Sequence, residues 1–162
     1  MPFCEYEPKV EVRRSPVHGW GLFSKCSIRY GEVICLYSGD LLSTSDMYIN
    51  RSDYVLDLGS GRYLDSNNRY NCAGRYINDS HGVRGSRNNA RYSSVLLWHD
   101  VMKKYYVNVI CNRHIAPDRE IFADYGKEYW DNKTQERKGV ICVNNFATQE
   151  ELKKLDMLIG IL

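Results

Sequence analysis

Arg75-Tyr76-Ile77-Asn78-Asp79-Ser80 is one of two stretches that decide the fold of this chain, and Glu120-Ile121-Phe122-Ala123-Asp124-Tyr125-Gly126 is the other. Taken alone, the second stretch is typical of a strand that ends in a turn, and Asn78 is typical of a turn amide. Neither stretch predicts a function by itself. A function can be predicted only when the surrounding segments are considered with them.

Short stretches rich in Val, Ile, Leu and Tyr accompany the two segments, and this composition is typical of strands. Turn residues such as Tyr30-Gly31 and Gly59-Ser60-Gly61 separate them at intervals that suit small antiparallel sheets. A short helix is expected between Ser43 and Asn50. The sequence therefore predicts a mostly β protein, with strands at Val10–Arg13, Leu22–Phe23, Val33–Tyr37, Tyr54–Leu58, Val95–Trp98 and Tyr105–Cys111.

The C-terminus has a different pattern. Thr148 and Glu151 form a capping box ahead of Leu152, Leu155 and Leu158. The spacing predicts an amphipathic helix near residues 148–160. Its apolar face suits packing on the core of the domain, or a surface for a partner or a second copy of the chain, and the pattern leaves both open.

Length and composition exclude several classes of protein. With 162 residues, 43% hydrophobic and 26% charged, the chain fits one globular domain and neither a disordered nor a membrane protein. A net charge of +2 does not predict direct binding to nucleic acid. The six cysteines form no C-x-x-C pair, so no metal site is expected. With no secretory signal at Met1-Pro2-Phe3-Cys4, an intracellular location with free thiols is favoured.

Further short motifs complete an ordered series with the two segments of the opening. They are Gly19-Trp20-Gly21, Tyr54-Val55-Leu56-Asp57-Leu58, Tyr63-Leu64-Asp65, Asn71-Cys72-Ala73-Gly74 and Asn89-Ala90-Arg91. In order and spacing the series resembles the SET domain, a family of protein lysine methyltransferases, from about Val10 to Trp130. We therefore expect a SET domain over residues 8–130. Residues 131–162 are expected to be a C-terminal segment that closes the lysine channel or packs on the core.

The resemblance implies several small sheets around a knot-like crossing, where cofactor and peptide enter from opposite faces. The cofactor would be S-adenosylmethionine, and the substrate a lysine-containing peptide. Gly19, Trp20 and Gly21 would cradle the methionine end of the cofactor through their backbone. Other expected cofactor contacts are Tyr54, Asn78, Asp79, Tyr125 and Trp130, the last by stacking on adenine.

Methyl transfer is an in-line displacement that requires a neutral amine, while the pKa of free lysine is about 10.4. The resemblance places the hydroxyl of Tyr125 beside the reacting atoms, where it would orient them, with Tyr54 as the second catalytic tyrosine. It also suggests two residues that set the number of methyl groups added. Ala123 would open space around the lysine nitrogen, whereas the hydroxyl of Tyr92 would hold a water there and favour monomethylation.

The sequence departs from the family pattern in three places. Asp79 stands where a histidine is usual, and its carboxylate could attract the positive sulfonium but could not donate as an imidazole does. An insertion over residues 82–88, with Arg84 and Arg87, precedes Asn89. A cysteine-rich tail is also missing, since only Cys142 lies beyond Tyr125.

The leading hypothesis is a lysine methyltransferase acting on a histone tail, and in the nucleus if the substrate is chromatin. Two alternatives come from other classes. Asp79 in place of histidine motivates a SET-fold binding module with weak catalysis. A binding protein of an unrelated small-barrel fold would match the motifs by chance, and cofactor binding would exclude it.

Overall fold

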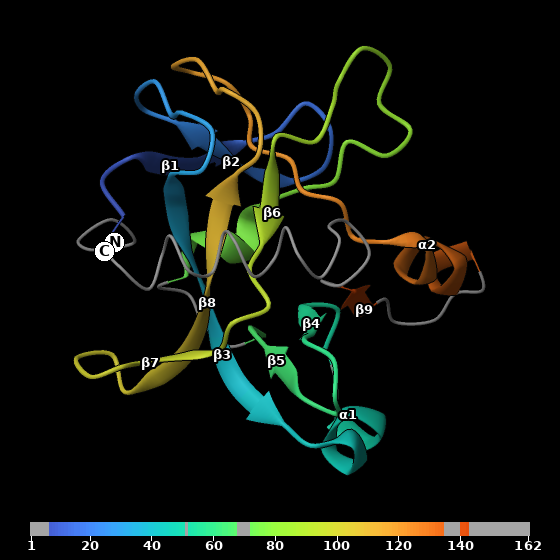
Figure 1. Cartoon of the computed structure of the whole chain (residues 1–162). Helices are drawn as coiled ribbons and strands as arrows, with labels where there is room; N and C mark the ends of the chain where they lie inside the picture. Colours follow the sequence, from blue (N-terminus) through green and yellow to red (C-terminus); the bar gives the residue numbers. More distant parts are fainter. Residues whose placement is uncertain (1–6, 51, 68–71, 135–139, 143–162) are drawn as a thin grey trace.

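The computed structural model describes residues 7–50, 52–67, 72–134 and 140–142 (Figure 1). Strands dominate this part of the chain, which confirms the mostly β class. They are β1 (Val10–Arg14), β2 (Trp20–Ser24), β3 (Val33–Leu42), β4 (Val55–Asp57), β5 (Tyr63–Asp65), β6 (Ala90–Tyr92), β7 (Leu97–His99), β8 (Lys104–Cys111) and β9 (Val140–Cys142). The helices are α1 (Thr44–Asn50), the 3-10 turn η1 (Ala73–Tyr76) and α2 (Lys127–Thr134).

The strands form two sheets. β1 and β2 pair as an antiparallel hairpin, with Val10 opposite Ser24 at its open end and Arg14 opposite Trp20 at its turn. The larger sheet has seven strands in the order β6-β8-β3-β5-β4-β9, and β7 pairs with β8 at one side. All its pairs are antiparallel except β4 with β9. Figure 1 shows the β1–β2 hairpin beside one end of the long β3–β8 pair.

The core lies between these sheets and the segments that cross them. Val107, Val109 and Ile110 of β8 are fully buried, as expected for an inner strand covered on both faces. Tyr37 of β3 is buried as well, and its hydroxyl donates to the carbonyl of Tyr54 at 2.6 Å. Because a buried hydroxyl is costly without a partner, this bond fixes the chain at Tyr54.

All six predicted strands are confirmed, with shifts of a few residues at their ends. The predicted helix near Ser43 is confirmed as α1, because Ser43 and Asp46 cap it reciprocally through Ser43 N–H to Asp46 Oδ2 (3.1 Å) and Asp46 N–H to Ser43 Oγ (3.3 Å). Sequence reasoning missed β5, β6, β9 and α2 as elements. The predicted helix near 148–160 lies outside the described residues.

A buried carboxylate anchors the start of the described chain. Glu7 is only 4% exposed, and it accepts the N–H groups of Leu36 (2.8 Å) and Ala73 (3.1 Å). It thereby joins the N-terminal segment to β3 and η1. Burial raises the pKa of Glu7 to about 7, although the two backbone donors oppose this shift.

We expect stability to fall as pH rises through the range in which Glu7 ionises. Its pKa in the folded state, about 7, exceeds the ordinary value of 4.5, so between these values the folded state holds the extra proton. The contribution of Glu7 to the free energy of unfolding should therefore drop by about 2–3 kcal/mol from pH 5 to pH 8. Urea unfolding at four pH values measures this slope.

Glu7→Gln should flatten the slope, even if the amide lowers stability at pH 5 by losing one acceptor. The control is Glu11→Gln, which removes a partly exposed carboxylate paired with Arg13 at 3.3 Å. Equal slopes in wild type and Glu7→Gln would contradict the assignment.

Candidate functional site

Three segments that are distant in sequence meet beside the β1–β2 turn. Asn78 and Phe122 form a parallel bridge, as do Ala90 and Ala123, and the N–H of Ala123 donates to the carbonyl of Asn78 at 3.0 Å. The two stretches that decide the fold therefore lie side by side. This arrangement puts the polar residues of both next to the Gly19 turn.

Asn78 links this junction to the β1–β2 turn. Its Nδ2 lies 3.2 Å from the carbonyl oxygen of His18, 3.1 Å from that of Trp20, and 3.0 Å from Oε1 of Glu120. The amide donors of Asn78 are thus held toward the turn and Glu120. Gly19 between the two carbonyls has φ +47, with nothing within 4 Å of where a Cβ would stand.

Glu120 belongs to the site, although the sequence analysis predicted no role for it. Its Oε1 accepts from Ser15 Oγ at 2.7 Å as well as from Asn78. A Cβ on Gly21 would stand 2.2 Å from the same oxygen. A side chain at position 21 would therefore require Glu120 to move away from its bonds with Ser15 and Asn78. In the sequence, only Gly21 indicated this contact, because a glycine lets another side chain approach the backbone as closely as a ligand can.

Asp79 is buried, with 6% of its surface exposed, and its carboxylate is fully engaged. One oxygen accepts from the N–H of Tyr125 and from Nε1 of Trp130, both at 2.9 Å. The other accepts from the N–H of His81 at 2.9 Å and the amide of Asn88 at 3.3 Å. A neutral imidazole has one acceptor nitrogen and could not replace these bonds. The departure from the family pattern therefore has a structural reason here.

Tyr125 is the most enclosed of the expected catalytic residues. Its hydroxyl donates to the carbonyl of Ile77, and its ring meets Tyr129 edge-on at 4.7 Å between centroids. Burial first, and then the neighbouring Tyr129 and Asp79, raise the pKa of Tyr125 well above its ordinary value of 10. The phenol therefore remains protonated at neutral pH, where it can donate a hydrogen bond but cannot serve as a base.

Helix α2, which starts directly after Gly126, adds an aromatic wall to the site. Its Trp130 lies nearly parallel to Tyr125 (6.1 Å, 12°), and the imidazole of His81 stacks on Trp130 (4.5 Å, 17°). His81 comes from the segment that precedes the insertion and was not among the expected site residues. The sequence places His81 two residues after Asp79, but its contact with Trp130 could be predicted only from the tertiary path of the chain.

Tyr54 lies at the same site and is 38% exposed. The guanidinium of Arg75 stands 4.2 Å above its ring, and 5.4 Å from the ring of Tyr76. Cation–π contacts of this kind are stronger where water is excluded. A fixed positive charge is therefore placed next to an accessible tyrosine.

The two residues expected to set the methyl count lie below this surface. Tyr92 is 4% exposed, and its hydroxyl has no hydrogen-bond partner among the described residues. Burial, followed by the nearby Tyr125 and Tyr37, raises its pKa well above 10. Ala123 is fully buried beside Asn78 and Ala90. A buried hydroxyl without a protein partner is uncommon and marks a place suited to a water or a ligand atom.

Comparison with known families identifies the class of protein. A model of the SET domain matches residues 19–126, the larger part of the chain. The chain therefore belongs to the SET-domain family.

Two plant proteins illustrate the relatives. One from Nicotiana tabacum, named histone-lysine N-methyltransferase, H3 lysine-9 specific SUVH1, is 28% identical over 149 residues, which cover 83% of this chain and 20% of that protein. Its Arabidopsis thaliana counterpart named SUVH5 is 29% identical over 124 residues, covering 72% of this chain and 15% of that protein. This chain thus spans a fifth or less of the length of these relatives.

Among solved structures, a candidate histone methyltransferase of Plasmodium falciparum is similar, with a TM-score of 0.54 and 21% identity. The match covers 75% of this chain and 96% of that chain. This likeness concerns the fold.

The described residues contain no group of three or more His, Cys, Asp or Glu side chains that could hold a metal ion. Nor does this part of the chain contain a helix long and apolar enough to cross a membrane.

Proposed function

We propose that this chain is a protein lysine methyltransferase domain that takes its methyl group from S-adenosylmethionine and transfers it to a histone tail. The observation that carries the proposal is the junction at which Asn78, Asp79 and Tyr125 are bonded together beside the Gly19 turn. The names of the sequence relatives support the histone substrate. A nuclear location follows if that substrate is chromatin.

The turn has the chemistry that the methionine end of this cofactor requires. The carbonyls of His18 and Trp20 are acceptors gathered at one place beside Nδ2 of Asn78, each oxygen has a second lone pair, and an ammonium group is a donor. The open space at Gly19 allows close approach to the backbone. Trp130 and His81 offer aromatic faces for adenine, with Asp79 fixing the indole. When bound, the cofactor would supply an electrophilic methyl group.

The residues around Tyr125 would prepare the amine. A lysine must lose its proton to attack, and a nearby positive charge favours the neutral form. Arg75, stacked over Tyr54, is such a charge. The protonated hydroxyl of Tyr125 would orient the reacting atoms, and the aromatic rings of Tyr54, Tyr129 and Trp130 would exclude water. The proton leaves with solvent, since Tyr125 is no base.

The test combines binding and transfer. Isothermal titration measures affinity for the cofactor, and radiolabelled cofactor with core histones measures transfer, with mass spectrometry to locate the modified lysine. We expect both binding and transfer. Cofactor binding with no transfer to any histone or lysate protein would favour the binding module, and no cofactor binding would contradict the proposal altogether.

A further prediction concerns the product. We expect wild type to add one methyl group, because a water held by the unpartnered hydroxyl of Tyr92 would resist displacement by an apolar methyl. Tyr92→Phe should then yield dimethyl product, read by mass spectrometry. Since the hydroxyl has no described partner, the substitution should cost little stability.

Tyr106→Phe, in a half-buried tyrosine of β8 that packs edge-on against His99 (5.8 Å), serves as the control and should leave the methyl count unchanged. Trimethyl product from wild type would exclude the restriction, and an unchanged count in Tyr92→Phe would exclude Tyr92 as its source.

A further inference from the structure

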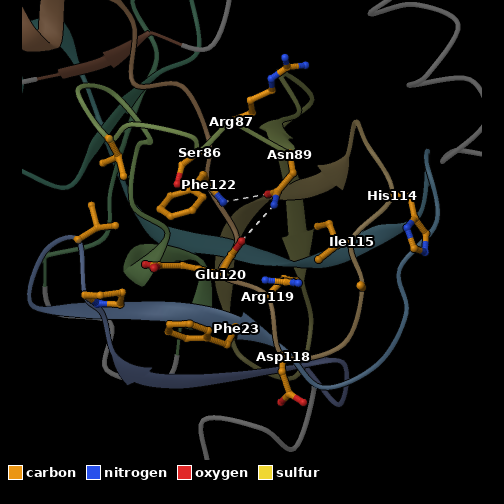
Figure 2. A pocket seen from close by; sticks show the side chains of 14 residues that line it. Phe23, Ser86, Arg87, Asn89, His114, Ile115, Asp118, Arg119, Glu120 and Phe122 are labelled. Atoms are coloured by element: carbon orange, nitrogen blue, oxygen red, sulfur yellow. Dashed lines mark hydrogen bonds between the residues drawn. The ribbon is translucent and has the colours of Figure 1, made fainter.

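A hollow of about 600 Å³ lies beside the β1–β2 hairpin (Figure 2). It is bordered by Pro16 and Val17 of the turn, by the insertion at residues 82–88, by β2, and by the segment 114–122. Asn78, Tyr54, Tyr125 and Trp130 do not line it. Its volume is in the range of ligand-binding clefts, and nothing in the proposed methyl transfer uses it.

The floor of the hollow is apolar and held in place. Phe23, Ile115 and Phe122 form it, and Figure 2 shows the two phenylalanine rings on opposite sides of Glu120. The side chain of Asn89 fixes the strand behind them, because its Nδ2 donates to the carbonyl of Glu120 (3.0 Å) and its Oδ1 accepts from the N–H of Phe122 (2.9 Å). A preformed floor reduces the ordering cost of binding.

The carboxylates around the floor have partners in the protein, whereas the arginines form no ion pair among the described residues. Glu120 is bonded to Ser15 and Asn78, and Asp118 lies 3.7 Å from the guanidinium of Arg13. Arg87 and Arg119, both exposed, form no ion pair with any described carboxylate. Figure 2 shows Arg119 near Ile115 and Phe23, while Arg87 extends outward at the rim. Two of the four Arg, Asp and Glu side chains that line the hollow are therefore arginines that form no ion pair with a described carboxylate.

We propose that this hollow binds a short acidic peptide segment, with one apolar side chain on the floor and carboxylates paired with Arg87 and Arg119. Arginine pairs with carboxylates through two parallel hydrogen bonds, which gives direction as well as attraction. A nucleic acid fits less well, because two arginines make a small basic footprint. The hollow shares Glu120 with the junction at Asn78, but peptide binding there requires no cofactor.

Binding can be measured by fluorescence polarisation with a labelled, capped pentapeptide in which two glutamates flank a central phenylalanine on each side. Wild type should bind it saturably. Arg87→Glu and Arg119→Glu should each weaken binding by at least about tenfold, since each replaces an attraction by a repulsion. The matched controls are Arg84→Glu, in the same insertion but outside the hollow, and Arg113→Glu, close to the segment 114–122; each should change affinity less than about threefold.

Two further probes test the floor and the class of ligand. Alanine in place of the central phenylalanine should weaken binding at least about fivefold, because one apolar side chain leaves the floor. A single-stranded oligonucleotide of equal charge should not compete.

Several results would overturn the proposal. They are the absence of saturable binding, equal losses in the Arg84 or Arg113 controls, indifference to the alanine exchange, and effective competition by the oligonucleotide. Because the readout is peptide binding without cofactor, its failure would leave the proposed methyl transfer untouched.

Discussion

Tyr125→Phe is expected to lower the rate of methyl transfer by about 10²-fold or more, while affinity for the cofactor stays within about threefold. The hydroxyl donates to the carbonyl of Ile77 and would orient the reacting atoms, so its loss acts mainly on the transition state. Single-turnover transfer to a histone peptide measures the rate, and isothermal titration measures the affinity.

Tyr129→Phe is the matched control. The ring of Tyr129 packs against Tyr125 at 4.7 Å between centroids, so this variant also loses a phenol hydroxyl, but a neighbouring one in the same cluster. It should retain most of the rate. Transfer by wild type should also rise from pH 7 to pH 9 as the substrate lysine loses its proton, since the phenol of Tyr125 stays protonated across this range. An unchanged rate in Tyr125→Phe would remove this residue from the mechanism.

Asp79→Ala should cause the largest loss of stability among the site substitutions, on the order of 3 kcal/mol, because it leaves the N–H of Tyr125 and the indole N–H of Trp130 without their acceptor. Asp79→His, which restores the usual residue of the family, should not rescue it, since one imidazole nitrogen cannot accept both bonds. Urea unfolding compares the variants.

A spectroscopic readout separates local positioning from general destabilisation. In a background of Trp20→Phe and Trp98→Phe, Trp130 is the only tryptophan. Asp79→Asn should then shift its emission under fully native conditions. Asp131→Ala, which removes an exposed carboxylate paired with Lys127 on the same helix, should change neither emission nor stability appreciably. If emission and stability are unchanged in Asp79→Asn, the bonds described for Asp79 carry little energy.

Local signals were sufficient to predict the longer strands. β8 is rich in Tyr, Val and Ile, and α1 has reciprocal caps at Ser43 and Asp46, so composition and capping agreed with the final structure. β5 and β6 are three-residue strands that are defined by their pairing with β3 and β8, and unlike the equally short β4 and β7 they were not predicted from local composition. Helix α2 carries Lys, Glu and Asn with little amphipathic pattern.

The candidate site divides in the same way. Asn78, Asp79 and Tyr125 were found because they belong to motifs with a recognisable order. The structural role of Asp79 was not predicted. Its carboxylate was expected to face the cofactor, and in the structure its oxygens accept hydrogen bonds from Tyr125, Trp130 and His81. These donors come from both sides of the insertion and from beyond Gly126, so their meeting depends on the tertiary path of the chain.

The parallel contact between Asn78 and Phe122 also determines when the site can exist during synthesis. The β1–β2 hairpin and the Asn78 segment leave the ribosome long before Tyr125 and Trp130, and contacts between such distant residues form slowly. Until residues 120–130 emerge, Asp79 lacks its two main donors and Ala123 cannot close the junction. A nascent chain should therefore gain affinity for its cofactor in one late step, and chains that stall before Tyr125 should gain none.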